Sequence, residues 1–188
     1  RLFLASVGTF GIGAFAASFF TLRALQLLRT THSTGTAGAL AIGLYTLYNL
    51  VYAASAYTAG EFADRVPKRW LLGVGYGLFF LTCLGFIWVE PDLVTLAVLF
   101  GLGGMYIGCI ETAEGSYAAE LLPAHLRGTG FGALAAVNGI GDTIASGVTG
   151  LLWTLIAPQA GFVFGATFAV LGLVVLTRTG ARQSISSP

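Results

Sequence analysis

Four ionisable side chains, Arg23, Glu111, Glu114 and Asp142, lie inside otherwise apolar stretches of the sequence. Glu111 and Glu114 are three residues apart, so on a helix their carboxyl groups share one face. Two acids so close together in a medium of low dielectric constant favour holding a proton. The pair is therefore typical of a proton carrier or of a site for a cationic substrate. The structural alternative, a pair with Arg127 or another basic loop residue, suits Glu114 better than Glu111.

Asp142 lies about 20 Å along its own apolar stretch, at about 1.5 Å per helical residue, where an unpaired carboxylate is costly. We expect it to have a partner. Arg23 is one candidate, although its long side chain is equally suited to reaching the membrane surface. Asn138 is one helical turn from Asp142 and shares its face.

A stripe of polar and aromatic side chains runs along a third apolar stretch. Its members are spaced three or four residues apart, as Tyr45, Tyr48, Asn49, Tyr52 and Ser55. On a helix this spacing gives one polar face. Tyrosine combines an apolar ring with a hydroxyl group, so the stripe predicts a cavity wall that contacts an amphiphilic organic substrate. Packing and hydrogen bonding between helices is the alternative interpretation.

The sequence lacks the arrangements of residues that form catalytic, metal-binding or phosphate-binding sites. The two histidines, His32 and His125, are far apart in connecting segments, and Lys68 is the only lysine. These numbers argue against a catalytic metal site and a phosphate-binding G-x-x-x-x-G-K loop. We therefore predict no catalytic residue, no metal and no cofactor, and hence a protein that is not an enzyme.

The composition identifies the solvent in which these side chains lie. Of the 188 residues, 56% are hydrophobic and 9% are charged, with a formal net charge of +1. The mean hydropathy is +0.84. So few charges cannot cover a soluble globule, and so small a net charge excludes nucleic acid as a partner. The chain is predicted to be an integral membrane protein whose partner is the lipid bilayer.

The apolar stretches predict an all-α membrane protein, a bundle of six transmembrane helices over residues 1–177. A span needs about 20 residues, and the break before the last one is marked by Pro158 and Gly161. The predicted spans cover residues 2–23, 37–59, 70–89, 93–117, 129–154 and 160–177.

The charges in the connectors predict how this bundle is oriented. Most basic residues fall at the termini and in the second and fourth connectors, which places both termini, including a polar tail at 178–188, in the cytoplasm. Glycines in the fourth and fifth spans predict that these two helices pack tightly, and the plain third and sixth spans are expected at the lipid-facing periphery.

Two cytoplasmic connectors carry recognisable patterns. Residues 60–69 read G-E-F-A-D-R-V-P-K-R, which resembles the loop signature G-x-x-x-D-R-x-G-[RK]-[RK] of the major facilitator superfamily. Pro67 stands where that signature usually has glycine. Residues 120–132 read E-L-L-P-A-H-L-R-G-T-G-F-G and are similar to a second conserved stretch of the same superfamily. With six spans of matching spacing, the resemblance covers nearly the whole chain.

The resemblance implies half of a twelve-helix transporter, and the polar tail matches its C-terminal half. Because the chain begins with Arg1, we expect it to be a segment of a longer protein that works with an N-terminal half or with a second copy. The resemblance also implies a conformational latch in the connectors, formed by Gly60, Asp64, Arg65, Lys68, Arg69, Glu120 and Arg127. The simpler interpretation of these charges is a positive-inside anchor.

Taken together, these features predict a secondary transporter of the inner cell membrane that moves a small organic solute by alternating access with proton coupling. The alternative is a non-transporting scaffold or receptor-like protein of the same fold. The candidate substrate and proton residues are Glu111, Glu114, Asp142, Asn138, Tyr45, Tyr48, Asn49, Tyr52 and Arg23.

Overall fold

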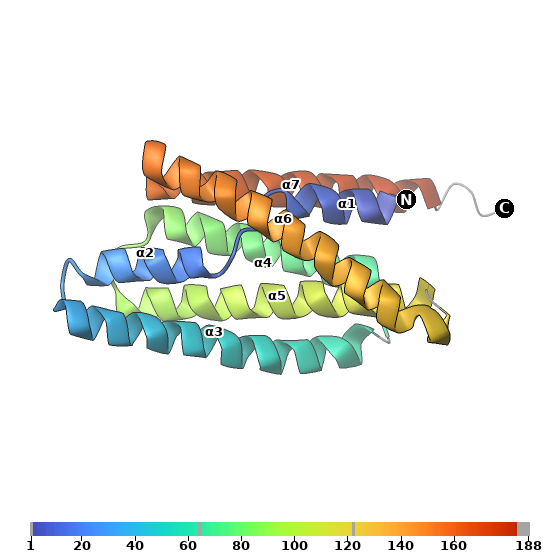
Figure 1. Cartoon of the computed structure of the whole chain (residues 1–188), viewed down its shortest axis with the longest axis horizontal. Coiled ribbons are helices and arrows are strands. Elements are labelled where there is room, and N and C mark those ends of the chain that lie inside the picture. Colours follow the sequence, from blue (N-terminus) through green and yellow to red (C-terminus); the bar gives the residue numbers. More distant parts are fainter. Residues whose placement is uncertain (1, 64, 122, 184–188) are drawn as a thin grey trace.

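The protein is a bundle of long helices that run side by side (Figure 1). The computed structural model describes residues 2–63, 65–121 and 123–183, and these residues contain no strand. In an apolar solvent each backbone group must find a partner within its own segment, which favours helices. The helices are α1 (Leu2–Gly11), α2 (Ser18–Leu28), α3 (Thr34–Ala63), α4 (Lys68–Trp88), α5 (Leu93–Leu121), the short 3-10 helix η1 (Ala124–Leu126), α6 (Arg127–Leu155) and α7 (Pro158–Gln183).

Four of these helices, α3, α4, α5 and α7, are long and apolar enough to cross a membrane. The predicted ranges 37–59, 93–117, 129–154 and 160–177 lie within α3, α5, α6 and α7, and α4 covers the range 70–89 except for its last residue. The helix α6 has 29 residues but is more polar, since it carries Asn138 and Asp142. The protein is thus an all-helical membrane bundle, as predicted.

The first predicted span is not one helix. Residues 12–17 leave the helical conformation and separate α1 from α2, so the prediction of a single helix over 2–23 is wrong. Gly13 lies at this break, where a Cβ atom would come within 2.3 Å of Phe168, and the backbone N–H of Ala16 donates to Ser146 Oγ of α6 at 3.0 Å. A neighbouring helix can thus satisfy the backbone groups that such a break exposes.

The end of the chain also differs from the prediction. The polar tail was expected to begin at residue 178, but α7 continues to Gln183. Residues 178–183 include arginine, alanine and glutamine, which favour helices, and no proline. The rest of the predicted tail, 184–188, lies outside the described residues, as do Arg1 and Asp64.

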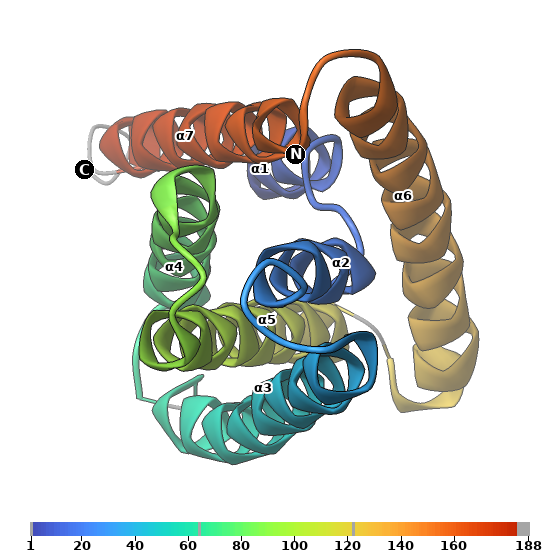
Figure 2. The same cartoon turned by 90° about the vertical axis from the view of Figure 1, so that its left-hand side faces the viewer.

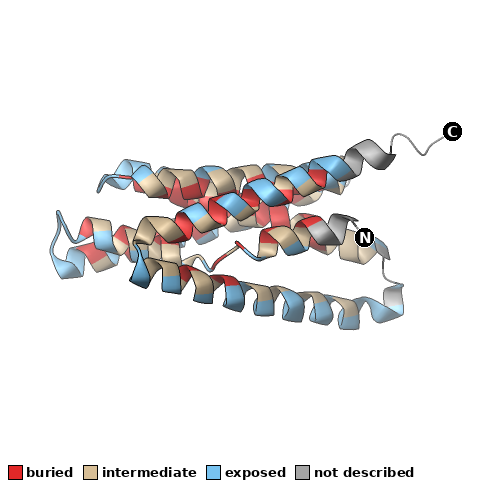
Figure 3. Cartoon of the chain, turned by 90° about the horizontal axis from the view of Figure 1, so that it is seen from above, coloured by how far each residue is buried: buried red, intermediate tan, exposed pale blue. Residues whose placement is uncertain are grey.

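Seen along the bundle, α5 lies between α3 and α4, and α4 packs in turn against α7 (Figure 2). The helix α6 packs mainly against α7 and lies along one side of the bundle. Buried residues concentrate between the helices (Figure 3), and in α6 they are Ala145 and Thr149. The start of α1 and the end of α7 lie at the same end of the bundle as the end of α3 and the start of α6 (Figure 1).

Phenylalanine rings fill the core where the broken first segment meets α4 and α7. The rings of Phe20 and Phe86 stack with their centroids 5.1 Å apart, and Phe162 stacks on Phe86 at the same distance. Phe15, within the break itself, is 2% exposed and meets Phe162 edge to face. The break is therefore held in place by an aromatic residue that points into the core.

Glycines bring α5 close to α3 rather than to α6. A Cβ atom on Gly104 would lie 2.5 Å from the carbonyl oxygen of Tyr48, and one on Gly108 would lie 2.4 Å from Ser55 Oγ. By contrast, Gly139 and Gly147 of α6 have nothing within 4 Å. The predicted tight packing of the fourth and fifth spans is wrong, because the small residues of α5 are used by α3.

Asp92 ends the connector between α4 and α5 and caps the latter helix. Its Oδ2 accepts hydrogen bonds from Thr95 Oγ1 at 2.6 Å and from the Thr95 backbone N–H at 2.7 Å. Both bonds favour the charged carboxylate, so they lower the pKa of Asp92. This residue fixes the start of α5, on which two of the candidate site residues lie.

Candidate functional site

The three candidate acids lie on the two helices α5 and α6, within electrostatic range of one another. Glu111 and Glu114 lie on α5, and Asp142 comes from the facing part of α6. Asp142 is close enough to Glu111 to interact with it electrostatically, and Glu114 interacts with both. Among the described residues none of the three forms an ion pair with lysine or arginine. The three carboxyl groups therefore lie within electrostatic range of one another and without a basic partner, but among the described residues no hydrogen bond joins them.

Glu111 is joined to the tyrosine stripe of α3. The Tyr52 hydroxyl donates a hydrogen bond to Glu111 Oε2, and this contact orients an otherwise exposed carboxyl group. The close α3–α5 packing at Gly104 and Gly108 places the two side chains within reach. A charge-assisted bond of this kind is among the stronger ones in proteins.

Glu114 is the most buried of the three acids, with 8% of its surface exposed. Its Oε2 accepts a hydrogen bond from Asn138 Nδ2 of α6 at 2.8 Å. Burial of a carboxyl group without such a bond is costly. The helix α6 otherwise contacts α5 only lightly, so this bond is a principal link between them.

The other stripe residues have different surroundings. The rings of Tyr45 and Tyr48 stack with centroids 5.9 Å apart, and Tyr48 is buried where it interacts with Tyr106 of α5. Asn49 is exposed and donates to the carbonyl oxygen of Tyr45 at 2.7 Å, within its own helix. The tyrosines thus form a continuous row, and Asn49 does not join the acids.

Arg23 and Asp142 form no ion pair. The Nε atom of Arg23 is buried and has no hydrogen-bond partner, and the charge that acts on Asp142 is that of Glu111. The reason is the break in the first segment: α2 starts at Ser18 and contacts α3, and Arg23 lies in its second turn. The proposed pair is therefore wrong.

Two exposed tryptophans indicate the depth of the site in the membrane. Trp70 and Trp88 are 64% and 72% exposed and lie near opposite ends of α4. They are about 27 Å apart along the helix axis, which matches the spacing of the two aromatic belts of a bilayer. The part of α4 between them is long and apolar enough to cross the hydrocarbon layer.

Contacts between neighbouring helices give the depth of the three acids relative to Trp70. A Cβ atom on Gly75 would lie 2.6 Å from Ile110, which places Glu111 about one helical turn inside the level of Trp70 and Glu114 close to that level. Phe10 stacks on Tyr76, which is about 9 Å inside the level of Trp70 along α4, and the carbonyl oxygen of the next residue, Gly11, is 3.9 Å from the Cβ position of Gly141. Asp142 is thus about 10 Å inside the level of Trp70. The three acids descend from mid-membrane to the surface on the side of the termini.

The two connectors predicted to form a latch are linked within this chain. The Lys68 ammonium group, at the start of α4, donates to Glu120 Oε1, near the end of α5. Arg65, Arg69 and Arg127 are exposed nearby in sequence, and Gly60 is half-buried at the end of α3. Asp64, the remaining acidic member of the pattern, lies outside the described residues.

Sequence reasoning missed two residues of the site, Tyr106 and Ser146. Tyr106 lies between the tyrosine row and the acids and interacts with Tyr48. Ser146 follows Asp142 by one helical turn, so the same spacing rule that placed Asn138 beside Asp142 also predicts its face. In the described part of the chain no group of histidine, cysteine and acidic residues is arranged to hold a metal ion.

Comparisons with known proteins agree with the arrangement. The sequence is 29% identical over 177 residues to the uncharacterized MFS-type transporter MJ1317 of Methanocaldococcus jannaschii, covering 94% of this chain and 44% of that protein. The chain thus spans less than half the length of this curated relative. No solved structure matches this chain significantly. The sequence pattern of the Major Facilitator Superfamily matches residues 1–187. Since that match covers nearly the whole chain, the protein belongs to the major facilitator superfamily of membrane transporters.

Proposed function

We propose that the chain is the C-terminal six-helix half of a proton-coupled secondary transporter for a small organic solute. Six crossings result if α1 and α2 together form one span and α6 forms another. The single observation that carries proton coupling is the group of three acids, Glu111, Glu114 and Asp142, which has no basic partner among the described residues. Acids inside a membrane mark ion or proton pathways.

In this proposal Glu111 carries the proton. It is intermediate in depth between Glu114 and Asp142, and its side chain is exposed beside Tyr52 of α3. Tyr52 positions its carboxyl group, while Asn138 keeps Glu114 in place at the surface end. Asp142, the deepest of the three, receives the proton near mid-membrane.

Alternating access requires a partner bundle, either an N-terminal half or a second copy of this chain. The helices α2, α3, α5 and α6 face that partner in this proposal, with α4 and the outer side of α7 toward lipid. The exposed tryptophans of α4 support this assignment. The connectors around Lys68 and Glu120 then form a latch that engages the partner in one state and releases it in the other.

The distribution of charge supports an orientation with both termini in the cytoplasm. Arg65, Lys68, Arg69, Arg127 and Arg178 lie near the end of the bundle that holds the termini (Figure 1), and Arg29 lies near the other end. Cytoplasmic loops carry the excess of arginine and lysine. The inner cell membrane is the corresponding location.

The test uses the protein in the longest form its gene encodes, reconstituted in proteoliposomes with a pH-sensitive dye inside. A panel of sugars, amino acids, amines and carboxylates is screened for solute-dependent proton movement. We expect Glu111→Gln to reduce gradient-driven accumulation by about tenfold or more, and exchange without a gradient to survive. Glu90→Gln, in an exposed connector, is the control. Accumulation that is unchanged in Glu111→Gln rejects the role.

A further inference from the structure

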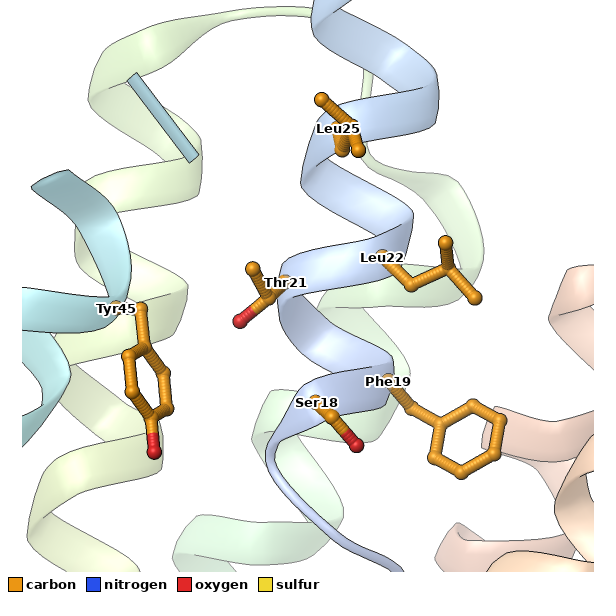
Figure 4. A pocket seen from close by; sticks show the side chains of 6 residues that line it. All are labelled: Ser18, Phe19, Thr21, Leu22, Leu25 and Tyr45. Atoms are coloured by element: carbon orange, nitrogen blue, oxygen red, sulfur yellow. The ribbon is translucent and has the colours of Figure 1, made fainter. Parts of the chain in front are cut away.

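An open cavity of about 520 Å³ lies on the opposite side of mid-membrane from the acids. Figure 4 shows its lining, which comes from α2 and from one residue of α3: Ser18, Phe19, Thr21, Leu22, Leu25 and Tyr45. Its volume falls in the range of small-molecule sites, about 300–1,000 Å³. Only Tyr45 was among the residues that the sequence analysis selected.

The break in the first membrane segment produces this cavity. Because the chain leaves the helix at residues 12–17, α2 starts anew at mid-membrane and leans on α3 rather than continuing the line of α1. Phe15 and Phe19 meet edge to face, and Phe19 also contacts Trp153 of α6 with ring centroids 5.6 Å apart. These rings fix the start of α2, so the cavity wall is preorganised.

The chemistry of the lining is uncharged. Three hydroxyl groups, those of Ser18, Thr21 and Tyr45, are set among aromatic and aliphatic side chains, and no acid or base lines the cavity. Arg23, although it belongs to α2, is not part of the lining. A charged group placed here would gain no counter-ion from this chain, whereas a neutral hydroxyl or amide would find hydrogen-bond partners on this wall.

The cavity is also separate from the proton-carrying residues. Tyr45 and Tyr52 lie on the same helix about 10 Å apart along its axis, and only Tyr52 contacts Glu111. The row of tyrosines between them is packed, with Tyr45 stacked on the buried Tyr48. A molecule in the cavity therefore does not need to touch the acids.

We propose that this cavity binds the transported solute and that the solute is a neutral amphiphile, with an apolar body and a hydroxyl or amide head, whose site is distinct from the proton site at Glu111. This inference rests on the proposed function, because it takes the bound molecule to be the solute that the protein transports. It assigns Tyr45 to the solute and leaves Glu111, Glu114 and Asp142 to the proton.

The test is a binding measurement that needs no gradient. Three probes share a naphthalene body and differ in their head group: 2-(naphthyl)ethanol, 2-(naphthyl)ethylamine and naphthylacetate. Their affinities for the detergent-purified protein, in the longest form its gene encodes, are read from thermal stabilisation and from quenching of tryptophan fluorescence. We expect the neutral alcohol to bind at least about tenfold more tightly than either charged probe.

The variants are chosen to change the cavity without changing its shape. Thr21→Val and Tyr45→Phe each remove one hydroxyl group, so each is expected to weaken binding of the alcohol by about 3- to 10-fold. Thr46→Val is the matched control, because the Thr46 hydroxyl is exposed and donates to its own helix at Ile42. Glu90→Gln, in an exposed connector away from the cavity, is expected to bind the alcohol like the unmodified protein.

Several results overturn the inference. These are tighter binding of the amine that is lost in Glu111→Gln, equal binding of all three probes, or no binding of the alcohol at millimolar concentration. If the alcohol binds as expected but no gradient drives its movement, the proposed transport function fails while the cavity assignment stands. If proton coupling is found with a charged solute, the proposed function stands and the cavity assignment fails.

Discussion

Asn138 of α6 donates its side-chain N–H to Glu114 of α5 at 2.8 Å, and this bond satisfies a carboxyl group that is almost fully buried. The two helices otherwise touch little. The bond therefore connects the position of α6 to Glu114, one of the three acids of the proposed proton group.

Replacing Asn138 by leucine leaves Glu114 buried without its partner. We expect Asn138→Leu to lower the free energy of unfolding by about 1–3 kcal/mol, the cost of an unsatisfied buried group. The measurement is thermal or denaturant unfolding in a mild detergent. Asn49→Leu is the control, since Asn49 is exposed and bonds within its own helix. Equal stability of the two variants contradicts the importance of the bond.

Removing the Tyr52 hydroxyl tests whether Glu111 needs to be positioned. Tyr52→Phe keeps the ring and deletes the hydrogen bond that joins α3 to this acid. We expect gradient-driven transport to fall about 3- to 30-fold, as for loss of a bond to a charged group, while solute exchange is retained. Tyr57→Phe, at an exposed position of the same helix, serves for comparison. A full transport rate in Tyr52→Phe argues against positioning.

The close contact of α3 and α5 is tested by adding one methyl group. Gly108→Ala puts a Cβ atom 2.4 Å from Ser55 Oγ and 2.9 Å from the backbone nitrogen of Ala56, so the helices have to separate. The expected loss of stability is about 1–3 kcal/mol. Gly101→Ala on the same helix meets nothing within 4 Å and is expected to have little effect. Similar unfolding midpoints for both variants rule out tight packing at Gly108.

The cap at the start of α5 predicts a dependence of stability on pH. Hydrogen bonds from Thr95 lower the pKa of Asp92 in the folded protein, so folding favours its charged form. The contribution is present above the ordinary aspartate pKa of about 3.9 and is lost as the pH falls through the lower folded value. Asp92→Asn removes this dependence. The check is a series of unfolding midpoints from pH 7 to pH 3, with Glu90→Gln as the control.

Much of the fold follows from the sequence because hydrocarbon accepts few structures. Charge-free stretches such as 37–59 have to be helices, and proline and glycine near Pro158 end one of them. The spacing of Glu111 and Glu114 on α5 and of Asn138 and Asp142 on α6 was also legible, since helical periodicity decides which residues share a face.

What the sequence did not reveal are relationships between helices. The break at residues 12–17 depends on Phe168 and Ser146, which come from α7 and α6 and cannot be paired with Gly13 and Ala16 by local pattern. The glycines of α5 predicted a closely packed neighbouring helix but did not identify that helix. For the same reason the cavity beside α2 was missed, because it exists only once the first segment is divided.

The hydroxyl of Ser146 connects the break in the first segment to the position of α6. It is the acceptor for an amide proton of Ala16 that no turn of helix can satisfy. If α6 moves outward, the Ala16 N–H loses its acceptor. Either residues 12–17 then move with α6, or a water molecule replaces the serine hydroxyl as the acceptor. An opening of this face therefore either moves residues 12–17 with α6 or wets the membrane interior beside Asp142.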